Sequence, residues 1–206
     1  MKIRLMVKDD IASVCELYHS AFWSKAKPLA RLEDQKAKQL IETIFFKAND
    51  NFRFYYVAEE EDQVLGVIKL MRSYDKERHS LPSLKQFVSV GFFRLIKTGL
   101  ILSLIDDEIN VQDLYVEILV VSPHARGKGI GSKLLDFALE KACESDCVNF
   151  LTLGVLAENT GAFRLYQRYG FEIVGEYQHN LLEKHAGIKK MLSMSKDIRR
   201  KNDCIL

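Results

Sequence analysis

Residues 114–155 constrain the fold of this chain more strongly than any other segment. Leu114 to Val121 is almost continuously apolar, which is typical of a strand covered on both faces of a sheet. Ile130 to Cys143 then carries apolar residues at the period of a helix, and Phe150 to Val155 is a second apolar run of strand length. A strand, a helix and a strand in this order form a right-handed crossover between two parallel strands. The segment therefore predicts a sheet with helices packed on it.

The remaining segments extend this unit into a mixed α/β domain. Alternating or β-branched runs predict further strands, and apolar residues three and four apart predict further helices. The expected strands are residues 2–7, 54–58, 64–70, 171–177 and 189–194, and the expected helices are residues 11–22, 28–46 and 160–169. The acidic run Glu59 to Asp62 predicts a solvated turn within an antiparallel hairpin. We expect a single domain over residues 1–206, with a twisted central sheet of about six or seven strands and helices on both faces.

The composition is that of one globular domain and gives no sign of a nucleic-acid partner. The 206 residues are 48% apolar, and 30 basic against 28 acidic residues leave a net charge of +2. The amino terminus turns acidic at Asp9 before an apolar signal region forms, which favours a cytoplasmic location. The four cysteines lack the spacing of a zinc site, so we expect reduced thiols and no metal.

Residues 73–112 interrupt the regular pattern as an apolar insertion. Within them, Phe87 to Ile105 predicts one or two helices over the sheet, either as a lid or as a contact in a homodimer. An interfacial amphipathic helix is another interpretation. A membrane span is disfavoured, because Arg94 and Lys97 lie near the middle of a segment that barely reaches the required length.

A glycine-rich loop, Arg126-Gly127-Lys128-Gly129-Ile130-Gly131, lies between the first strand and the helix of the parallel unit. At a helix start, unpaired N–H groups and the helix dipole favour an anion, and glycine lets a bulky group approach the backbone. Arg126 and Lys128 add donors for phosphate. The spacing fits neither the P-loop nor the dinucleotide-binding fingerprint. The loop is therefore either a pyrophosphate site of another kind or a turn with solvated basic side chains.

Two motifs resemble the GNAT superfamily of N-acetyltransferases. The loop, as Arg-x-x-Gly-x-Gly after a strand that ends in Val-x-Pro, resembles the cofactor motif of that family. Asn159 to Phe171 resembles its second segment, Asn-x-x-Ala-x-x-Leu-Tyr-x-x-x-Gly-Phe, and Ile3-Arg4 followed by Asp9-Asp10 resembles its start. The resemblance implies the GNAT fold and transfer of an acetyl group from acetyl-CoA to a primary amine by direct attack, without a cysteine acyl-enzyme or a metal.

The resemblance also implies where acetyl-CoA binds. The strand Leu114–Val121 is expected to splay from the strand Phe150–Val155, so that the pantetheine arm pairs with backbone groups of Leu119 and Val121 like an added strand. An N–H group near Leu119 would stabilise the oxyanion that forms as the amine attacks. The implied cofactor-binding residues are Leu119, Val120, Val121, Arg126, Gly127, Lys128, Gly129, Ile130, Gly131, Ser132 and Asn159.

Glu117 and Tyr166 are the candidate catalytic residues. Glu117 is the only charged residue within Leu114–Val121, and the resemblance to polyamine-type members makes it a candidate base for the amine proton. We expect burial to raise its pKa toward the working pH, and the alternative is a structural carboxylate. Tyr166 matches the tyrosine that protonates the departing thiolate in the family, and its alternative is an aromatic core residue. Asn159 either binds the cofactor arm or caps the helix that follows it.

The sequence leaves other functions open. A catalytically inactive acyl-CoA-binding or sensing module of the same fold needs the loop and the splayed strands, but neither Glu117 nor Tyr166. A nucleotide-dependent kinase or phosphate-binding protein would prefer ATP to acetyl-CoA. The acceptor is equally open among protein amino termini, polyamines, aminoglycosides and free amino acids.

Overall fold

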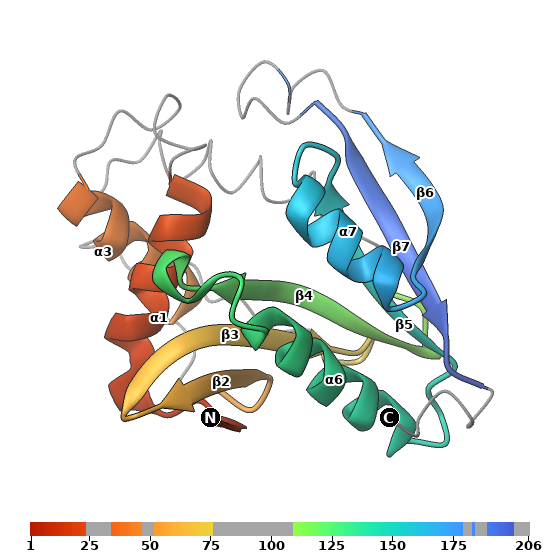
Figure 1. The fold of residues 1–206 in the computed structure, drawn as a ribbon, viewed down its shortest axis with the longest axis horizontal. Helices are drawn as coiled ribbons and strands as arrows, with labels where there is room; N and C mark the ends of the chain where they lie inside the picture. The colour runs from red at the N-terminus through yellow and green to blue at the C-terminus, as the bar shows by residue number, and fades with distance from the viewer. Residues whose placement is uncertain (24–33, 47–51, 76–108, 179–182, 184–188, 200–206) are drawn as a thin grey trace.

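The computed structural model describes residues 1–23, 34–46, 52–75, 109–178, 183 and 189–199. Within them, seven strands form one sheet in the order β1-β2-β3-β4-β5-β7-β6 (Figure 1). The strands are β1 (Lys2–Leu5), β2 (Tyr55–Glu60), β3 (Gln63–Met71), β4 (Asp113–Val121), β5 (Phe150–Leu156), β6 (Glu172–Tyr177) and β7 (Met191–Asp197). β4 and β5 are parallel, and every other neighbouring pair is antiparallel. The predicted mixed sheet with one parallel unit is confirmed.

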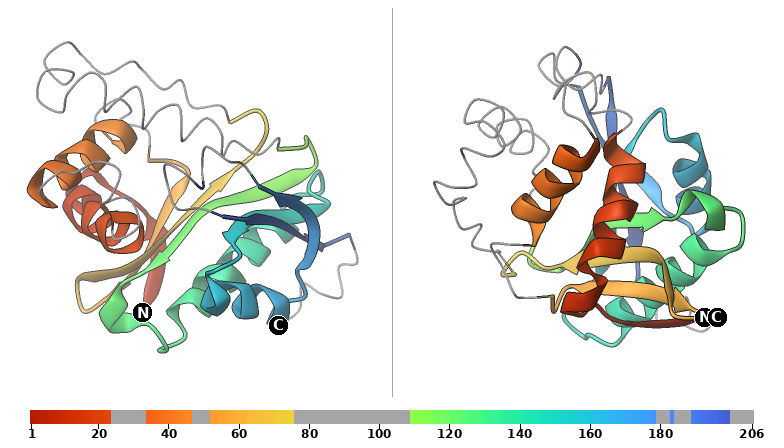
Figure 2. Two further views of the ribbon diagram at one scale, coloured as in Figure 1. Left: turned by 90° about the horizontal axis from the view of Figure 1, so that it is seen from above. Right: turned by 90° about the vertical axis from the view of Figure 1, so that its left-hand side faces the viewer.

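Helices cover both faces of this sheet, as predicted (Figure 2). They are α1 (Ile11–Tyr18), α3 (Asp34–Phe45), α6 (Ile130–Cys143) and α7 (Thr160–Arg168), with the short 3-10 segments η1 (Lys8–Asp10) and η3 (Pro123–Ala125) and the π-helical turn η2 (His19–Trp23). Val67 of β3 packs in the cluster that contains Val14 of α1. The next residue, Ile68, packs in the cluster that contains Leu134 of α6. Because consecutive strand residues point to opposite faces, the continuous apolar run of β3 reflects burial on both sides.

Most element boundaries agree with the periodicity of the sequence. α6 begins at Ile130 and ends at Cys143, as the apolar spacing predicted. The helix expected over residues 11–22 is α-helical only to Tyr18 and continues as the π-helical turn η2. Both forms place apolar residues on nearly the same stripe over so short a length, so periodicity does not separate them.

The turn between β2 and β3 is shorter than the acidic run predicted. Glu61 and Asp62 have positive φ angles of 50° and 60° and form a two-residue turn, a type that matches the twist of the flanking strands. Glu59 belongs to β2, where its carboxylate accepts a hydrogen bond from Arg4 Nε at 2.6 Å. The ion pair with Arg4 on the neighbouring strand therefore holds Glu59 in β2, although the acidic composition around it predicted a solvated turn.

Arg4 also ties the edge of the sheet to the start of α1. Its guanidinium donates to the two carboxylate oxygens of Asp10 at 2.7 and 2.9 Å. Asp10 accepts a further hydrogen bond from the Val7 N–H at 2.8 Å. Hydrogen bonding from Arg4 holds the pKa of Asp10 below its usual range. The network fixes the first helix against β1 and β2.

The greater part of the predicted insertion, residues 76–108, lies outside the described residues, so its interpretations as a lid, dimer contact or interfacial helix stay predictions. In the described ranges, no helix combines the length and the apolarity needed to cross a bilayer. Cys15 is a buried thiol and Cys147 an exposed one. Cys143, by contrast, is disulfide-bonded, so the expectation of reduced thiols is wrong for this residue.

Candidate functional site

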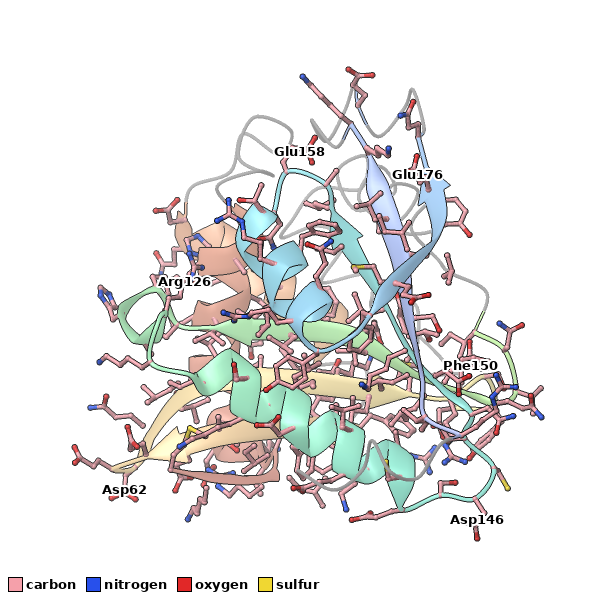
Figure 3. The ribbon with its side chains drawn as sticks, turned by 45° about the vertical axis from the view of Figure 1, so that its right-hand side comes forward. Asp62, Arg126, Asp146, Phe150, Glu158 and Glu176 are labelled. Carbon is pink, nitrogen blue, oxygen red and sulfur yellow. The ribbon has the colours of Figure 1, made fainter. Side chains whose placement is uncertain are left out.

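β4 and β5 part from each other halfway along β4, and we call this place the divergence. The parallel pairing runs from Asp113 opposite Phe150 to Val116 opposite Leu153, and no later pair joins the two strands in the described chain. β5 continues to Leu156 through its other edge, which pairs with β7. In Figure 3, β4 and β5 start together near Phe150 and run apart toward Arg126 and Glu158. The splay that the sequence resemblance implied is therefore present.

The register with β3 decides which backbone groups of β4 face the divergence. Ser122 N donates to Leu65 O at 2.8 Å, and hydrogen-bonded positions alternate along an antiparallel pair. By this alternation, Val120 exchanges its backbone hydrogen bonds with β3. The N–H and C=O groups of Leu119 and Val121 then point away from β3, toward the divergence. Among the predicted backbone ligands, Leu119 and Val121 are thus placed to bind an added chain, and Val120 is engaged in the sheet.

A β-bulge at Glu117 marks the start of the divergence. Lys69 pairs with Ile118 and Leu70 with Val116, so Glu117 is the extra residue of β4. The bulge also changes which face of the sheet the side chains of β4 point to. Val116 belongs to the core under α6, whereas Ile118 belongs to the core under α1. Continuous strand geometry would have kept these two side chains on one face.

The predicted pyrophosphate loop joins the end of β4 to α6. Gly127 and Gly129 have φ angles of 77° and 79°, which favour glycine, and an added Cβ at either would meet nothing within 4 Å. α6 begins after Gly129 with no side-chain cap and no acidic residue in its first turn. The first N–H groups of a helix have no acceptor within it, so those of Ile130, Gly131 and Ser132 are available to an anion.

Around this helix start, basic side chains are exposed to solvent, and the residues beneath them are packed in the core. Arg126 and Lys128 are exposed, and Arg126 Nε donates to Val121 O at 3.4 Å. Ile130 is 4% exposed and anchors the loop in the core. A Cβ on Gly131 would lie 3.4 Å from Leu165 Cδ2 of α7 and 3.7 Å from Val121 Cγ2. The loop, β4 and α7 therefore meet at this glycine.

Glu117 is held by a lysine that the sequence reading did not single out. Its Oε2 atom lies 2.7 Å from Lys69 Nζ, with side-chain exposures of 33% for Glu117 and 2% for Lys69. The burial expected for Glu117 is not found, because its bulged position leaves it at the surface of the divergence. A signal for the pair was present: Lys69 and Glu117 are each the single charge inside an otherwise apolar run. Two lone opposite charges in central strands are expected to pair.

Tyr166 and Asn159 lie on or next to α7. Tyr166 is 6% exposed and packs against Phe171, with ring centroids 5.9 Å apart. Burial raises the pKa of Tyr166 to about 12. Asn159 caps α7, since its side-chain oxygen accepts a hydrogen bond from Ala162 N at 3.4 Å. The capping interpretation of Asn159 is therefore confirmed, and its role toward a cofactor stays a prediction.

No group of three or more His, Cys, Asp or Glu side chains in the described ranges is placed to hold a metal ion. The residues brought together are instead a strand edge (Leu119, Val121), an uncapped helix start with basic neighbours (Arg126–Ser132), and a carboxylate at the divergence (Glu117). This arrangement can hold a diphosphate at one end and an extended, amide-bearing arm along β4.

Comparison with known sequences gives a consistent picture. The model of the Acetyltransferase (GNAT) family matches residues 13–171. The chain is 26% identical over 154 residues to the uncharacterized N-acetyltransferase YobR of Bacillus subtilis (strain 168), covering 69% of this chain and 59% of that protein. It is 30% identical over 101 residues to N-alpha-acetyltransferase 50 of Danio rerio, covering 48% and 60%. It is 31% identical over 75 residues to the probable spermine N(1)-acetyltransferase of Bacillus subtilis subsp. natto (strain BEST195), covering 36% and 49%. The matches thus span about half of the length of these relatives.

Solved structures share the fold over nearly their whole length. An N-acetyltransferase from Staphylococcus aureus Mu50 superposes with a TM-score of 0.69 at 19% identity, covering 95% of this chain and 100% of that one. Naa50 of Arabidopsis thaliana, in complex with the bisubstrate analogue CoA-Ac-MVNAL, gives a TM-score of 0.56 at 19% identity, covering 95% and 97%. At these identities the likeness shows the fold alone.

Proposed function

This chain belongs to the acetyltransferase (GNAT) family, and from that premise we propose that it transfers the acetyl group of acetyl-CoA to a primary amine by direct attack. The observation that carries the proposal is the divergence of β4 from β5 beside the uncapped start of α6. Coenzyme A carries a diphosphate on an arm with two amide groups. An anion-binding helix end next to an unpaired strand edge is complementary to both parts.

In this proposal, the pyrophosphate binds the N–H groups at the start of α6, and Arg126 and Lys128 add charge. The pantetheine arm pairs with Leu119 and Val121, whose backbone groups face the divergence. The thioester carbonyl lies near the Leu119 N–H, which stabilises the oxyanion formed during attack. Val120 supports the site indirectly, by bonding to β3.

Glu117 is proposed as the acceptor of the amine proton. A protonated amine has no lone pair, so it must lose a proton before it attacks the thioester. Glu117 lies two residues before Leu119, at the point where β4 leaves β5. Its side chain is 33% exposed, so an amine or a bridging water has access to the carboxylate.

Tyr166 is proposed as the hydrogen-bond donor to the departing sulfur. With a pKa of about 12, its hydroxyl stays protonated throughout the neutral range. Full proton transfer from such a phenol to a thiolate with an ordinary pKa of about 8.5 is uphill by about 5 kcal/mol. The hydroxyl therefore stabilises the thiolate by donation, and solvent supplies the final proton.

Two measurements test the proposal. Calorimetric titration with acetyl-CoA tests binding, and release of free thiol in the presence of spermidine, glycine or a peptide with a free amino terminus tests transfer. Binding together with amine-dependent thiol release supports an enzyme. Binding without release from a broad panel of amines would instead support an inactive acyl-CoA-binding module, and absence of binding contradicts both.

A matched pair of glycine variants locates the binding site. Gly129 and Gly170 both have a φ of 79°, so replacement by alanine imposes the same backbone strain, about 1–2 kcal/mol, at either position. Only Gly129 lies at the proposed pyrophosphate. We expect Gly129→Ala to lower the affinity for acetyl-CoA at least about 10-fold, by loss of about one backbone hydrogen bond to a charged group, and Gly170→Ala to leave it unchanged. Equal losses in both variants would contradict the assignment of the loop.

A further inference from the structure

Lys69 is a buried cation in the middle of an apolar strand. It is the one charged residue of β3, and its side chain is 2% exposed. Its Nζ atom lies 2.7 Å from Glu117 Oε2 and 5.0 Å from the ring centroid of Tyr55 on β2. A buried ammonium is retained only where other groups compensate its lost hydration. The carboxylate of Glu117 and the face of the Tyr55 ring do so here.

Glu117 connects this buried cation with the divergence. It is the bulged residue at which β4 parts from β5, and its side chain is 33% exposed. Lys69 pairs with one carboxylate oxygen, Oε2. The other oxygen, Oε1, has no hydrogen-bond or ion-pair partner among the described residues. Within the part of the chain that the structure describes, the carboxylate is thus fixed at one oxygen and open at the other.

We propose that Lys69 is a positioning residue for acetyl transfer, which holds Oε2 of Glu117 and so orients the carboxylate with Oε1 toward the acceptor amine. The inference rests on the proposed function, and it adds a residue of β3 to the proposed catalytic residue Glu117 on β4. A glutamate without an ion-pair partner would sample many rotamers on its flexible side chain. The ion pair restricts these rotamers before the acceptor arrives.

The aromatic neighbour of the pair does not supply this charge. The ring of Tyr55 on β2 lies 5.0 Å from Lys69 Nζ, and a phenol ordinarily carries no charge at neutral pH. Within the described ranges, the ion-pair partner of Glu117 is Lys69. Removing the Lys69 ammonium therefore removes the ion-pair partner that the described part of the chain gives this carboxylate.

The pair gives a balanced sequence of proton movements. The acceptor ammonium gives a proton to Oε1, directly or through water, and becomes a neutral amine. Its lone pair forms the new C–N bond, and the nitrogen loses a second proton to solvent as the amide forms. The C–S bond of the thioester breaks, and the sulfur leaves as a thiolate that takes up a proton from solvent. Protonated Glu117 has lost its favourable pairing with Lys69, so its proton passes to solvent and the carboxylate is restored.

Carboxyl-carbon NMR of protein labelled with ¹³C-glutamate tests the electrostatic part without an acceptor. The Glu117 resonance is assigned by its loss in Glu117→Gln. In Lys69→Met, an apolar side chain of similar length replaces the ammonium, and we expect the Glu117 carboxyl resonance to move away from its wild-type chemical shift as the ion pair is lost. Lys69→Arg keeps a cation and should leave the resonance near its wild-type position. An unchanged resonance in folded Lys69→Met, with folding checked by its thermal transition, overturns the inference.

Kinetics with the best amine from the panel of spermidine, glycine and peptide test the positioning part. We expect Lys69→Met to lower kcat at least about 10-fold, and Lys69→Arg to restore most of this loss, with the Kd for acetyl-CoA unchanged in both variants. In the Glu117→Gln background, Lys69→Met should have no further effect on kcat. Additive losses overturn the inference alone, because they show that Lys69 does not act through Glu117. Absence of thiol release by the wild-type protein overturns the proposed function as well.

Discussion

The two proposed catalytic residues differ in their exposure to solvent. Tyr166 is 6% exposed, and the loss of solvent raises its pKa to about 12, so the hydroxyl holds its proton. The Glu117 side chain is 33% exposed, and one of its carboxylate oxygens pairs with the Lys69 ammonium. Aminolysis of a thioester needs a donor for the sulfur and an acceptor for the amine proton. The environments of these two residues suit those two roles.

Tyr166→Phe tests the donor role. The substitution removes one hydroxyl and preserves the ring that packs on Phe171. We expect kcat to fall about 10- to 100-fold, which corresponds to the loss of one hydrogen bond to a charged group, with the Kd for acetyl-CoA unchanged. Because the pKa of Tyr166 is about 12, its ionisation should cause no fall in wild-type activity up to about pH 10. An unchanged kcat in the variant would leave Tyr166 as a core residue only.

Asp10 predicts a pH dependence of stability that is independent of function. Pairing with Arg4 lowers the folded pKa of Asp10 below the ordinary value of 3.8. Its stabilisation is therefore present above that value and is lost as the pH falls through the lower folded pKa. We expect Asp10→Asn to be less stable than wild type by about 1–3 kcal/mol at neutral pH. Denaturation measured at successive pH values should show this difference shrinking below about pH 4, and a difference constant with pH would contradict the ion pair.

At the scale of the elements, the sequence predicted what local periodicity encodes and missed what pairing between strands creates. The apolar period of residues 130–143 and the run of residues 114–121 predicted α6, β4 and their parallel partner. The bulge at Glu117 was not predicted, because register depends on β3 rather than on β4 itself. The Lys69–Glu117 pair was missed for the same reason, since its partners lie 48 residues apart in the numbering, 117 less 69.

Gly66 tests how the sheet positions α6. A Cβ on Gly66 would lie 3.0 Å from Leu134 Cδ1, 3.1 Å from Val120 O and 3.2 Å from Ile130 Cγ2. We therefore expect Gly66→Ala to displace the side chains of Leu134 and Ile130 by a few tenths of an ångström and to disturb the packing of α6 on β3, at a cost of about 1–3 kcal/mol. Because the proposed pyrophosphate site is that helix start, we expect a lower thermal transition together with weaker binding of acetyl-CoA. Gly161→Ala, whose Cβ meets nothing within 4 Å, is the control. Loss of stability with unchanged affinity for acetyl-CoA would contradict the placement of the binding site at the start of α6.

For the whole molecule, the divergence means that hydrogen bonds between β4 and β5 make the sheet continuous only at the beginning of these two strands. β4 and β5 share the pairs from Asp113–Phe150 to Val116–Leu153. Beyond them, α6 joins the two parts, because its residues Leu134 and Leu135 share one core with Ile68 of β3 and Met194 of β7. A ligand that lies between the strands and touches the start of α6 would complete the connection. Ligand binding should therefore stabilise the molecule as a unit and protect the edge of β4.

Amide hydrogen exchange measured by NMR tests this connection residue by residue. In the free protein, the N–H groups of Ile118 and Val120 are expected to exchange slowly, because the register bonds them to β3, while those of Leu119 and Val121 exchange faster. Acetyl-CoA at about 100 times its Kd should slow Leu119 and Val121 about 100-fold, if exchange requires release of the ligand. The same concentration of ATP, which has a triphosphate but no pantetheine arm, should slow neither residue to this extent. Equal protection by ATP, or protection that does not alternate along β4, would contradict a strand-like arm and favour a site that recognises phosphate alone.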